Sequence, residues 1–175
     1  IGVRLVGSEM CIRDRVIANE VLDALPVERI TFSKGKLFRQ AVSIDKKSRT
    51  LFLDEMPITS ELEKSIELAK SELGITIPPK DALEGWMTEW HVDNLKWLKA
   101  IYGKINNGIL LIIDYAKEAE KYYTSKNSDG TIVSYENQKM TNNVLDSPGN
   151  CDLTSHVCIE TLINDAETLG SVSYT

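Results

Sequence analysis

The sequence has little of what a membrane-spanning, zinc-binding or nucleic-acid-binding protein needs. Its longest uninterrupted aliphatic run is residues 109–113, far short of the roughly 20 residues of a membrane-spanning helix. Its three cysteines form no CxxC pair, which excludes a zinc ribbon and favours a reducing, cytoplasmic setting. With 20 Lys and Arg against 26 Asp and Glu, its bulk charge attracts neither nucleic acid nor anionic lipid.

Two catalytic signatures are also missing. No two of the ten glycines are spaced as GxG, and no GxSxG is present. The sequence therefore contains neither a glycine-rich nucleotide loop nor the nucleophile turn of a serine hydrolase. Cys151 and Cys158 lie seven residues apart with no accompanying metal motif, so we interpret both as packing residues.

The length and composition predict one folded domain. A chain of 175 residues, 42% of them apolar, can bury a substantial core. Residues 1–15 show neither a helix cap nor a hydrophobic period, and we interpret them as a non-native or disordered segment. Residues 170–175 resemble a strand cut short. We therefore expect residues 16–175 to be the C-terminal part of a larger domain.

The first half of the chain predicts strands followed by a helix. Residues 16–18 form a short apolar strand, and residues 19–25 form a turn or short helix that Pro26 stops. From 27 to 53, β-forming segments alternate with polar turns and predict a meander. Residues 59–73 predict a helix that Thr59 or Ser60 caps and Gly74 ends.

The second half predicts helices around a buried strand. Residues 83–105 carry three tryptophans with amphipathic spacing and predict a long helix. Residues 109–113 suit a parallel strand that is covered on both faces. A strand near 131–135 and a helix over 159–169 follow. This alternation indicates an α/β fold.

Polar residues follow both apolar strands, where an open α/β sheet carries its functional groups. Asn19 and Glu20 follow the first strand, and Asp114 follows the second. On a helical turn Glu20 and Asp23 share a face and could clamp a guanidinium or hold a metal. The alternatives are that Asp114 only caps a following turn, and that Asn19, Glu20 and Asp23 are a helix-capping cluster.

The two histidines differ in their sequence context. His156 follows the segment DLTS after a Pro-Gly loop, and loops often carry functional groups. His91 lies in the predicted tryptophan-bearing helix, where a structural or capping role is favoured. We therefore treat His156, and not His91, as a candidate site residue.

Four blocks together resemble a known family. The chain reads NEVLDALPV at 19–27, TEWH at 88–91, IDY at 113–115 and PGNCDLTSH at 148–156. In order and spacing these are similar to blocks of a family of S-adenosylmethionine-dependent methyltransferases. Its mitochondrial, MidA-like relatives are protein arginine methyltransferases that help to assemble respiratory complex I. The resemblance covers residues 16–170.

The departures from the family pattern concern single residues and one whole region. Ala116, Gln138 and Cys158 stand where many members have Gly, His and Asp, which argues against Gln138 and Cys158 as catalysts. In the family, a glycine-rich cofactor loop and a ribose-binding acid precede the NEVLDALPV block. Here fifteen unrelated residues stand before it. The resemblance thus implies that this chain alone is inactive.

The fold that the resemblance implies is a partial Rossmann-like methyltransferase sheet. Residues 16–18 would be its fourth strand and residues 109–113 its fifth, with 27–105 as a β-meander and helical insertion. The cofactor would be S-adenosyl-L-methionine and the acceptor a protein side chain, arginine in the relatives. No metal, nucleic acid or membrane is implied, and a homo-oligomer stays open.

The resemblance also implies residue roles. The cofactor would contact Asn19, Glu20 and Asp114. The catalytic groups would be Glu20, Asp23 and His156, and the substrate would meet Asp23, Asp152 and His156.

Two alternatives of other classes remain. One is a noncatalytic assembly module that uses the tryptophan-bearing segment 27–105. The other is a metal-dependent hydrolase that uses Glu20, Asp23, Asp114 and His156.

Overall fold

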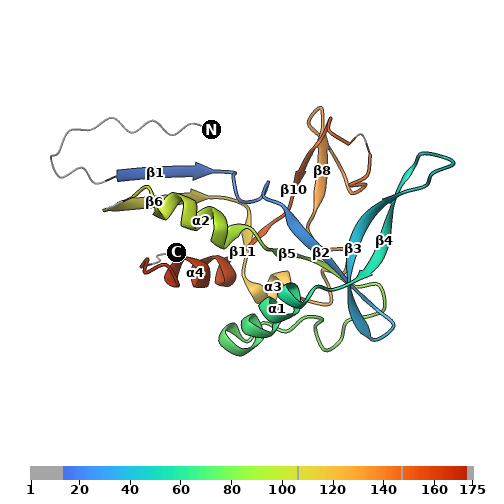
Figure 1. Ribbon diagram of the computed structural model, residues 1–175, viewed down its shortest axis with the longest axis horizontal. Helices are drawn as coiled ribbons and strands as arrows, with labels where there is room; N and C mark the ends of the chain where they lie inside the picture. Colours follow the sequence, from blue (N-terminus) through green and yellow to red (C-terminus); the bar gives the residue numbers. More distant parts are fainter. Residues whose placement is uncertain (1–13, 106, 147, 173–175) are drawn as a thin grey trace.

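The computed structural model describes residues 14–105, 107–146 and 148–172 (Figure 1). Strands β1 (Asp14–Asn19) and β6 (Gly108–Ile113) form a parallel pair in which Val16 lies opposite Leu110. The predicted adjacency of these two strands is confirmed. Strand β1 includes the last two residues of the segment interpreted as non-native, whereas residues 1–13 of that segment lie outside the described residues.

Among the described residues the β1–β6 pair is covered on one face only, so the prediction that the second strand is covered on both faces was wrong. Ala18 and its half-buried neighbours Leu110 and Ile112 point to one side. On the other side Ile17 and Ile109 are 69% and 63% exposed. A continuous apolar run indicates burial on both faces only when the layer that covers the second face is present.

The predicted meander is confirmed as part of an antiparallel sheet in the order β4-β3-β2-β5. Its members are β2 (Val27–Ser33), β3 (Lys36–Ile44), β4 (Leu51–Pro57) and β5 (Met87–His91). Lys34 and Gly35 join β2 to β3, and both have a positive φ, as the favoured two-residue hairpin turn requires.

Helix α1 (Ser60–Leu73) covers this sheet, with the predicted ends. Thr59 Oγ1 accepts the N–H of Leu62 at 3.2 Å, and Gly74 ends the helix in the left-handed conformation. The buried helix face packs with sheet and loop residues into one core. That core contains Ile30, Leu62, Ile66, Ala69, Ile75, Ile77, Trp86, Trp90, Tyr122, Tyr123 and Cys158.

The predicted helix over 83–105 was wrong in its first half. Residues Met87–His91 form β5, and only α2 (Asn94–Tyr102) is helical. Strand β5 pairs with β2 from Val27↔His91 to Thr31↔Met87, and Thr88, Glu89 and Trp90 are buried in it. Tryptophan spacing suggested a helix, but ladder hydrogen bonds and burial in the sheet outweigh such a local pattern.

The remaining elements are short and bring the C-terminal half back to the strand ends. They are β7 (Ala116–Lys117), α3 (Ala119–Tyr122), β8 (Val133–Glu136), β9 (Lys139–Thr141), β10 (Asp152–Thr154), β11 (Val157–Cys158) and α4 (Ile159–Glu167). Strand β8 lies between β10 and β9, and β11 pairs in parallel with β7. The predicted strand near 131–135 is confirmed as Val133–Glu136, and the predicted helix over 159–169 is confirmed as the shorter Ile159–Glu167. Within the described residues no helix has the length and apolar character to cross a membrane.

Candidate functional site

The carboxyl end of β6 organises the turn that follows β1. Asp114 Oδ2 accepts the backbone N–H groups of Val21, Leu22 and Asp23 at 3.2, 2.9 and 3.3 Å. Its Oδ1 accepts the N–H of Tyr115 at 2.8 Å. Asp114 therefore caps a turn, but the turn follows the neighbouring strand. The two predicted strand ends do meet at one place.

Glu20 and Asp23 lie in this turn in different surroundings. The segment is not helical, because Glu20 has a φ of 49°, so the interpretation as a helical turn with a shared face was wrong. Glu20 is exposed, and Asp23 is buried. Burial raises the pKa of Asp23, and the charges of Asp114 and Glu20 raise it further. The acids are thus close enough to repel one another.

The segment after β10 closes over the same turn. The N–H of Ser155 donates to Asp23 O at 2.9 Å, and the N–H of Val157 donates to Tyr115 O at 2.8 Å. The rings of Tyr115 and His156 meet edge to face, with centroids 6.3 Å apart. The charge of Glu20 raises the pKa of Tyr115. Three segments that are distant in the sequence therefore converge here.

The backbone of His156 is held from both sides. Its N–H donates to Thr131 Oγ1 at 3.0 Å, and its carbonyl lies 2.8 Å from His91 Nε2. A carbonyl only accepts, so His91 Nε2 carries the proton, and this contact supports the structural interpretation of His91. Burial lowers the pKa of both histidines, and the charge of Lys117 lowers that of His156 further.

Thr131, which holds His156, is itself bound by a fully buried carboxylate, Glu89, for which the sequence predicts no role. Glu89 Oε2 accepts the N–H and the hydroxyl of Thr131 at 2.8 and 3.0 Å and the hydroxyl of Tyr122 at 3.2 Å. Its Oε1 accepts the N–H of Ile132 at 3.3 Å and lies 3.9 Å from Arg29 Nε. Each oxygen of this buried charge therefore has polar partners.

Gly130 permits the loop to wrap around Glu89. It has a φ of +75°, and a Cβ atom there would clash with the Glu89 carboxylate. The sequence signal for this arrangement was the TEWH block, but a buried acid cannot be inferred from the strand sequence alone. Glu89 thus orders Thr131, and Thr131 orders His156.

The two remaining candidates lie at the margin of the cluster. Asn19 is exposed and ends β1 opposite Ile113. Asp152 is exposed at the start of β10, where it pairs with Tyr135. The structure therefore brings Glu20, Asp23, Asp114 and His156 together, whereas Asn19 and Asp152 flank them.

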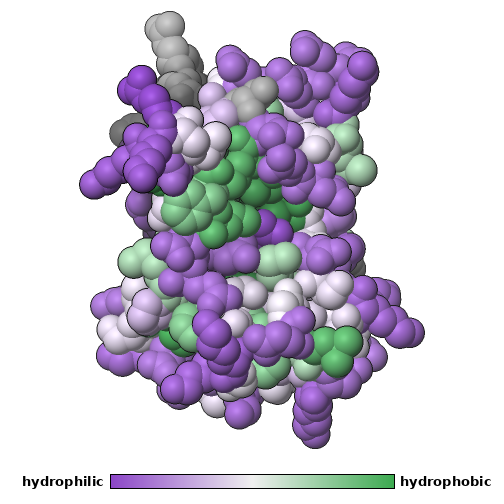
Figure 2. All heavy atoms as spheres, turned by 90° about the vertical axis from the view of Figure 1, so that its right-hand side faces the viewer, coloured by the Kyte–Doolittle hydropathy of each residue, from purple (hydrophilic) through white to green (hydrophobic). Residues whose placement is uncertain are grey.

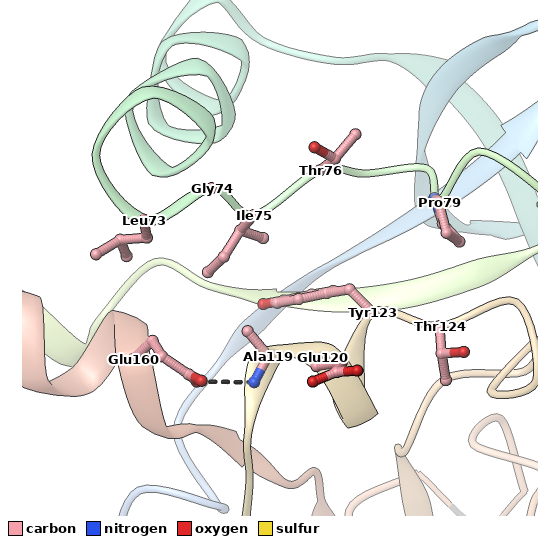
Figure 3. A pocket seen from close by; sticks show the side chains of 10 residues that line it. All are labelled: Leu73, Gly74, Ile75, Thr76, Pro79, Ala119, Glu120, Tyr123, Thr124 and Glu160. Atoms are coloured by element: carbon pink, nitrogen blue, oxygen red, sulfur yellow. Dashed lines mark hydrogen bonds between the residues drawn. The ribbon is translucent and has the colours of Figure 1, made fainter.

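A separate pocket of about 410 Å³ lies where the end of α1 faces α3 and the start of α4 (Figure 3). Leu73 and Ile75 line one side, and Ala119 lies opposite, where its N–H donates to Glu160 Oε2 at 2.7 Å. None of its lining residues belongs to the strand-end cluster. The candidate site is therefore an open, acidic surface and not this pocket.

The chemistry of the strand-end cluster suits a cationic ligand. Asp23 Oδ1 is buried and has no hydrogen-bond partner among the residues that the structure describes. A buried carboxylate oxygen in that condition is costly unless a donor reaches it. Within the same residues no group of three or more His, Cys, Asp or Glu side chains is placed to hold a metal ion.

Comparisons with known proteins agree with this picture. Residues 8–175 match a family described as "Putative S-adenosyl-L-methionine-dependent methyltransferase". A comparison with curated proteins finds no match.

Two similar crystal structures come from Burkholderia thailandensis proteins of one superfamily. One is described as a "likely methyl transferase" bound to S-adenosyl-homocysteine, and the other as uncharacterized. Each is 26% identical to this chain with a TM-score of 0.77 over 91% of it. The chain spans 38% and 40% of their respective lengths.

Proposed function

We propose a function that starts from one premise: the chain belongs to the S-adenosyl-L-methionine-dependent methyltransferase family just described. It forms the acceptor side of an enzyme that methylates a protein side chain, with arginine as the acceptor. The observation that carries this proposal is the convergence of Glu20, Asp23 and His156 at the ends of two parallel strands. In open α/β sheets this is the edge at which ligands bind. We further propose a cytoplasmic enzyme, which the free thiols of Cys151 and Cys158 support.

The residues present fit one side of such a cofactor and its acceptor. When bound, S-adenosyl-L-methionine supplies a methyl group that its sulfonium already activates. Asn19 and Glu20, exposed at the end of β1, would hold the ammonium group at the amino-acid end of the cofactor. Asp114 contributes to cofactor binding only indirectly, because its carboxylate oxygen Oδ2 already accepts backbone N–H groups of the turn. What the chain supplies is orientation and negative charge.

The acceptor guanidinium would meet the two carboxylates of the turn. Glu20 is exposed and can reach a substrate. Asp23 Oδ1 has no partner among the described residues but is buried, so it would accept an N–H of the guanidinium only if the turn opens. Methylation of a guanidinium releases a proton. His156 can accept that proton, because burial lowers its pKa and keeps the imidazole neutral at pH 7. Asp152, at the margin, would contact the substrate beyond the reacting group.

This chain offers residues for only one side of the cofactor. No glycine pair is spaced as GxG, so the close backbone approach that holds a nucleotide cofactor is not provided by these residues. We therefore propose that the chain alone neither binds the cofactor usefully nor catalyses, and that activity belongs to a longer chain containing that loop.

The experiment that tests the proposed function is methyl transfer by the longer parent protein. Purified parent is incubated with radiolabelled S-adenosyl-L-methionine and cell extract, and the modified residue is mapped by mass spectrometry. We expect label on arginine, and a loss of at least about 100-fold with Glu20→Gln, the scale typical of losing one positioned charged group. Glu61→Gln, an exposed carboxylate in α1, is the matched control.

Two results would contradict the proposal. Label on another residue type would reject arginine as the acceptor but leave the methyltransferase. Full turnover by Glu20→Gln would remove the strand-end cluster from the mechanism.

A further inference from the structure

The outer part of the β3–β4 hairpin extends beyond the rest of the molecule (Figure 1). We call its residues 41–54 the arm. Every residue of β4 is exposed, and four aliphatic side chains of the arm share one face, because directly paired residues of antiparallel strands point to the same side. They are the pairs Val42↔Leu53 and Ile44↔Leu51, which are 59%, 37%, 55% and 36% exposed in that order.

These apolar side chains lack a covering layer in the part of the chain that the structure describes. Figure 2 looks at the side toward which the arm points and shows hydrophobic atoms gathered into a patch bordered by hydrophilic ones. A two-stranded ribbon has no layer of its own to bury such a face. Contiguous exposed apolar surface with a polar rim is typical of an interface.

Strand β4 is also an edge with free backbone groups. Among the residues that the structure describes, the order β4-β3-β2-β5 gives it a neighbour on one side only. The N–H of Asp45 donates to Thr50 O at 2.9 Å, so the polar groups of Thr50, and of every second residue after it, face β3. Those of Leu51, Leu53 and Glu55 therefore point outward, which makes β4 a template for another strand.

The charges along this edge indicate the partner. Basic residues lie at the tip of the arm, including Arg49, and acidic Glu55 lies near its base. Suppose a second β4 pairs antiparallel around Phe52. Leu51 then lies opposite the partner's Leu53. The partner's Glu55 lies beside the turn before β4, which carries Arg49 with a φ of 58°. Pairing around Leu53 instead would place Leu51 opposite the partner's Glu55, which matches neither charge nor hydrophobicity.

We propose that a second copy of this chain binds at the arm, with β4 paired to β4 of the partner around Phe52. The two β3–β4 ribbons then form one continuous sheet. Its apolar face carries Val42, Ile44, Leu51 and Leu53 from each copy, flanked by two Arg49–Glu55 pairs. Such a contact is isologous, so it closes as a dimer and does not propagate.

The test is the mass of the 175-residue chain in solution, by analytical ultracentrifugation from 1 to 100 µM. All variants carry Ile17→Lys, which suppresses association through the exposed β1–β6 face. We expect a dimer in this background and a monomer after Leu53→Lys. A monomer already in the Ile17→Lys background, or a dimer that survives Leu53→Lys, would overturn the proposal.

The charge pair gives a sharper test. Arg49→Glu and Glu55→Lys should each weaken dimerisation roughly tenfold, because each places like charges opposite one another. The double variant should restore most of it, because each reversed charge meets its reversed partner. Glu55→Lys also loses the 3.6 Å contact with Lys34 of its own chain, which the double variant does not recover. Failure of the double variant to recover would contradict the register, since only a facing pair can compensate in this way.

A cysteine scan checks the register without relying on affinity. Around Phe52 the two copies of that residue lie opposite each other in a non-hydrogen-bonded pair, about 4.5 Å apart at Cα, which suits a disulfide. Phe52→Cys should crosslink under mild oxidation. Met56→Cys, similarly exposed at 42% against 43%, should not. Equal crosslinking at both positions would reject the proposed pairing.

Discussion

Asp114, the first residue after β6, accepts the backbone N–H of Leu22 at 2.9 Å in the turn that follows β1. The contact spans 92 residues of sequence and joins the ends of two parallel strands. Leu22 is fully buried, whereas Glu20 in the same turn is exposed. By holding the backbone of Leu22, the Asp114 carboxylate determines how the turn presents its acids.

Replacing Asp114 should destabilise the protein. Asp114→Asn removes the charge and one of two oxygens that together accept four backbone N–H groups. We expect a loss of about 1–3 kcal/mol in the free energy of unfolding, measured by urea denaturation. Asp54→Asn, exposed in β4, should change it by less than about 0.5 kcal/mol. Equal effects would show that the turn does not depend on Asp114.

Gly130 should not tolerate a side chain. In Gly130→Ala the new Cβ meets the Glu89 carboxylate, and the residue must also keep a positive φ. We expect a loss of more than about 2 kcal/mol in stability. Gly149→Ala is the matched control, since its φ is +83° but nothing lies within 4 Å, and it should cost about 1 kcal/mol. Thermal unfolding measures both, and a cost no larger than the control's would contradict the packing around Glu89.

Asp165 in α4 should make stability fall as the pH rises. Burial raises its pKa from 3.8 to about 6, and Lys99 lowers it in part. The folded state therefore holds the proton more tightly, and the stability that this provides is lost between pH 3.8 and about 6. Asp165→Asn should gain about 1 kcal/mol at pH 7, after allowing for screening by water, and nothing below pH 4.

The control for this prediction is Glu167→Gln, an exposed carboxylate in the same helix. Urea denaturation at pH 3.5, 5 and 7 measures each variant. A gain from Asp165→Asn that is the same at all three pH values would exclude the titration of Asp165 as its cause.

The isolated chain should bind S-adenosyl-L-methionine weakly. Its residues offer the carboxylates near β1 but no glycine-rich loop, and each missing hydrogen bond costs roughly 1 kcal/mol. The deficit of several bonds should place the dissociation constant in the millimolar range or above. Isothermal titration calorimetry measures it. A micromolar constant would mean that residues 1–13 or a second copy supply the missing contacts.

Local sequence was sufficient where neighbours in the chain decide the structure. Thr59, Gly74 and the apolar stripe between them specify α1, because capping and periodicity act within a few residues. The alternation of strand and turn residues from 27 to 53 likewise specifies the hairpins. The apolar run 109–113 and the polar residues after it predicted the pairing of β6 with β1.

Tertiary structure decided what local pattern left ambiguous. Residues Met87–His91 carry tryptophan spacing that suits a helix, yet they form β5 because β2 offers a ladder of hydrogen bonds and the core takes up Trp90. Local pattern also left out the role of Glu89, and it did not show that the turn which Asp114 caps follows the other strand, β1. Each carboxylate is defined by backbone N–H groups that come from a different segment, and only folding brings those donors to it.

The sequence by itself thus determined the methyltransferase family, the secondary structure near strong caps and turns, and which residues follow the two strands. Only the tertiary structure decided that Asp23 is buried while Glu20 is exposed, and that Thr131 and His91 hold His156 from both sides. The physical reason is the sequence distance over which each interaction acts. Propensity and capping are set by adjacent residues, whereas burial and hydrogen-bond partners depend on segments far away in the chain.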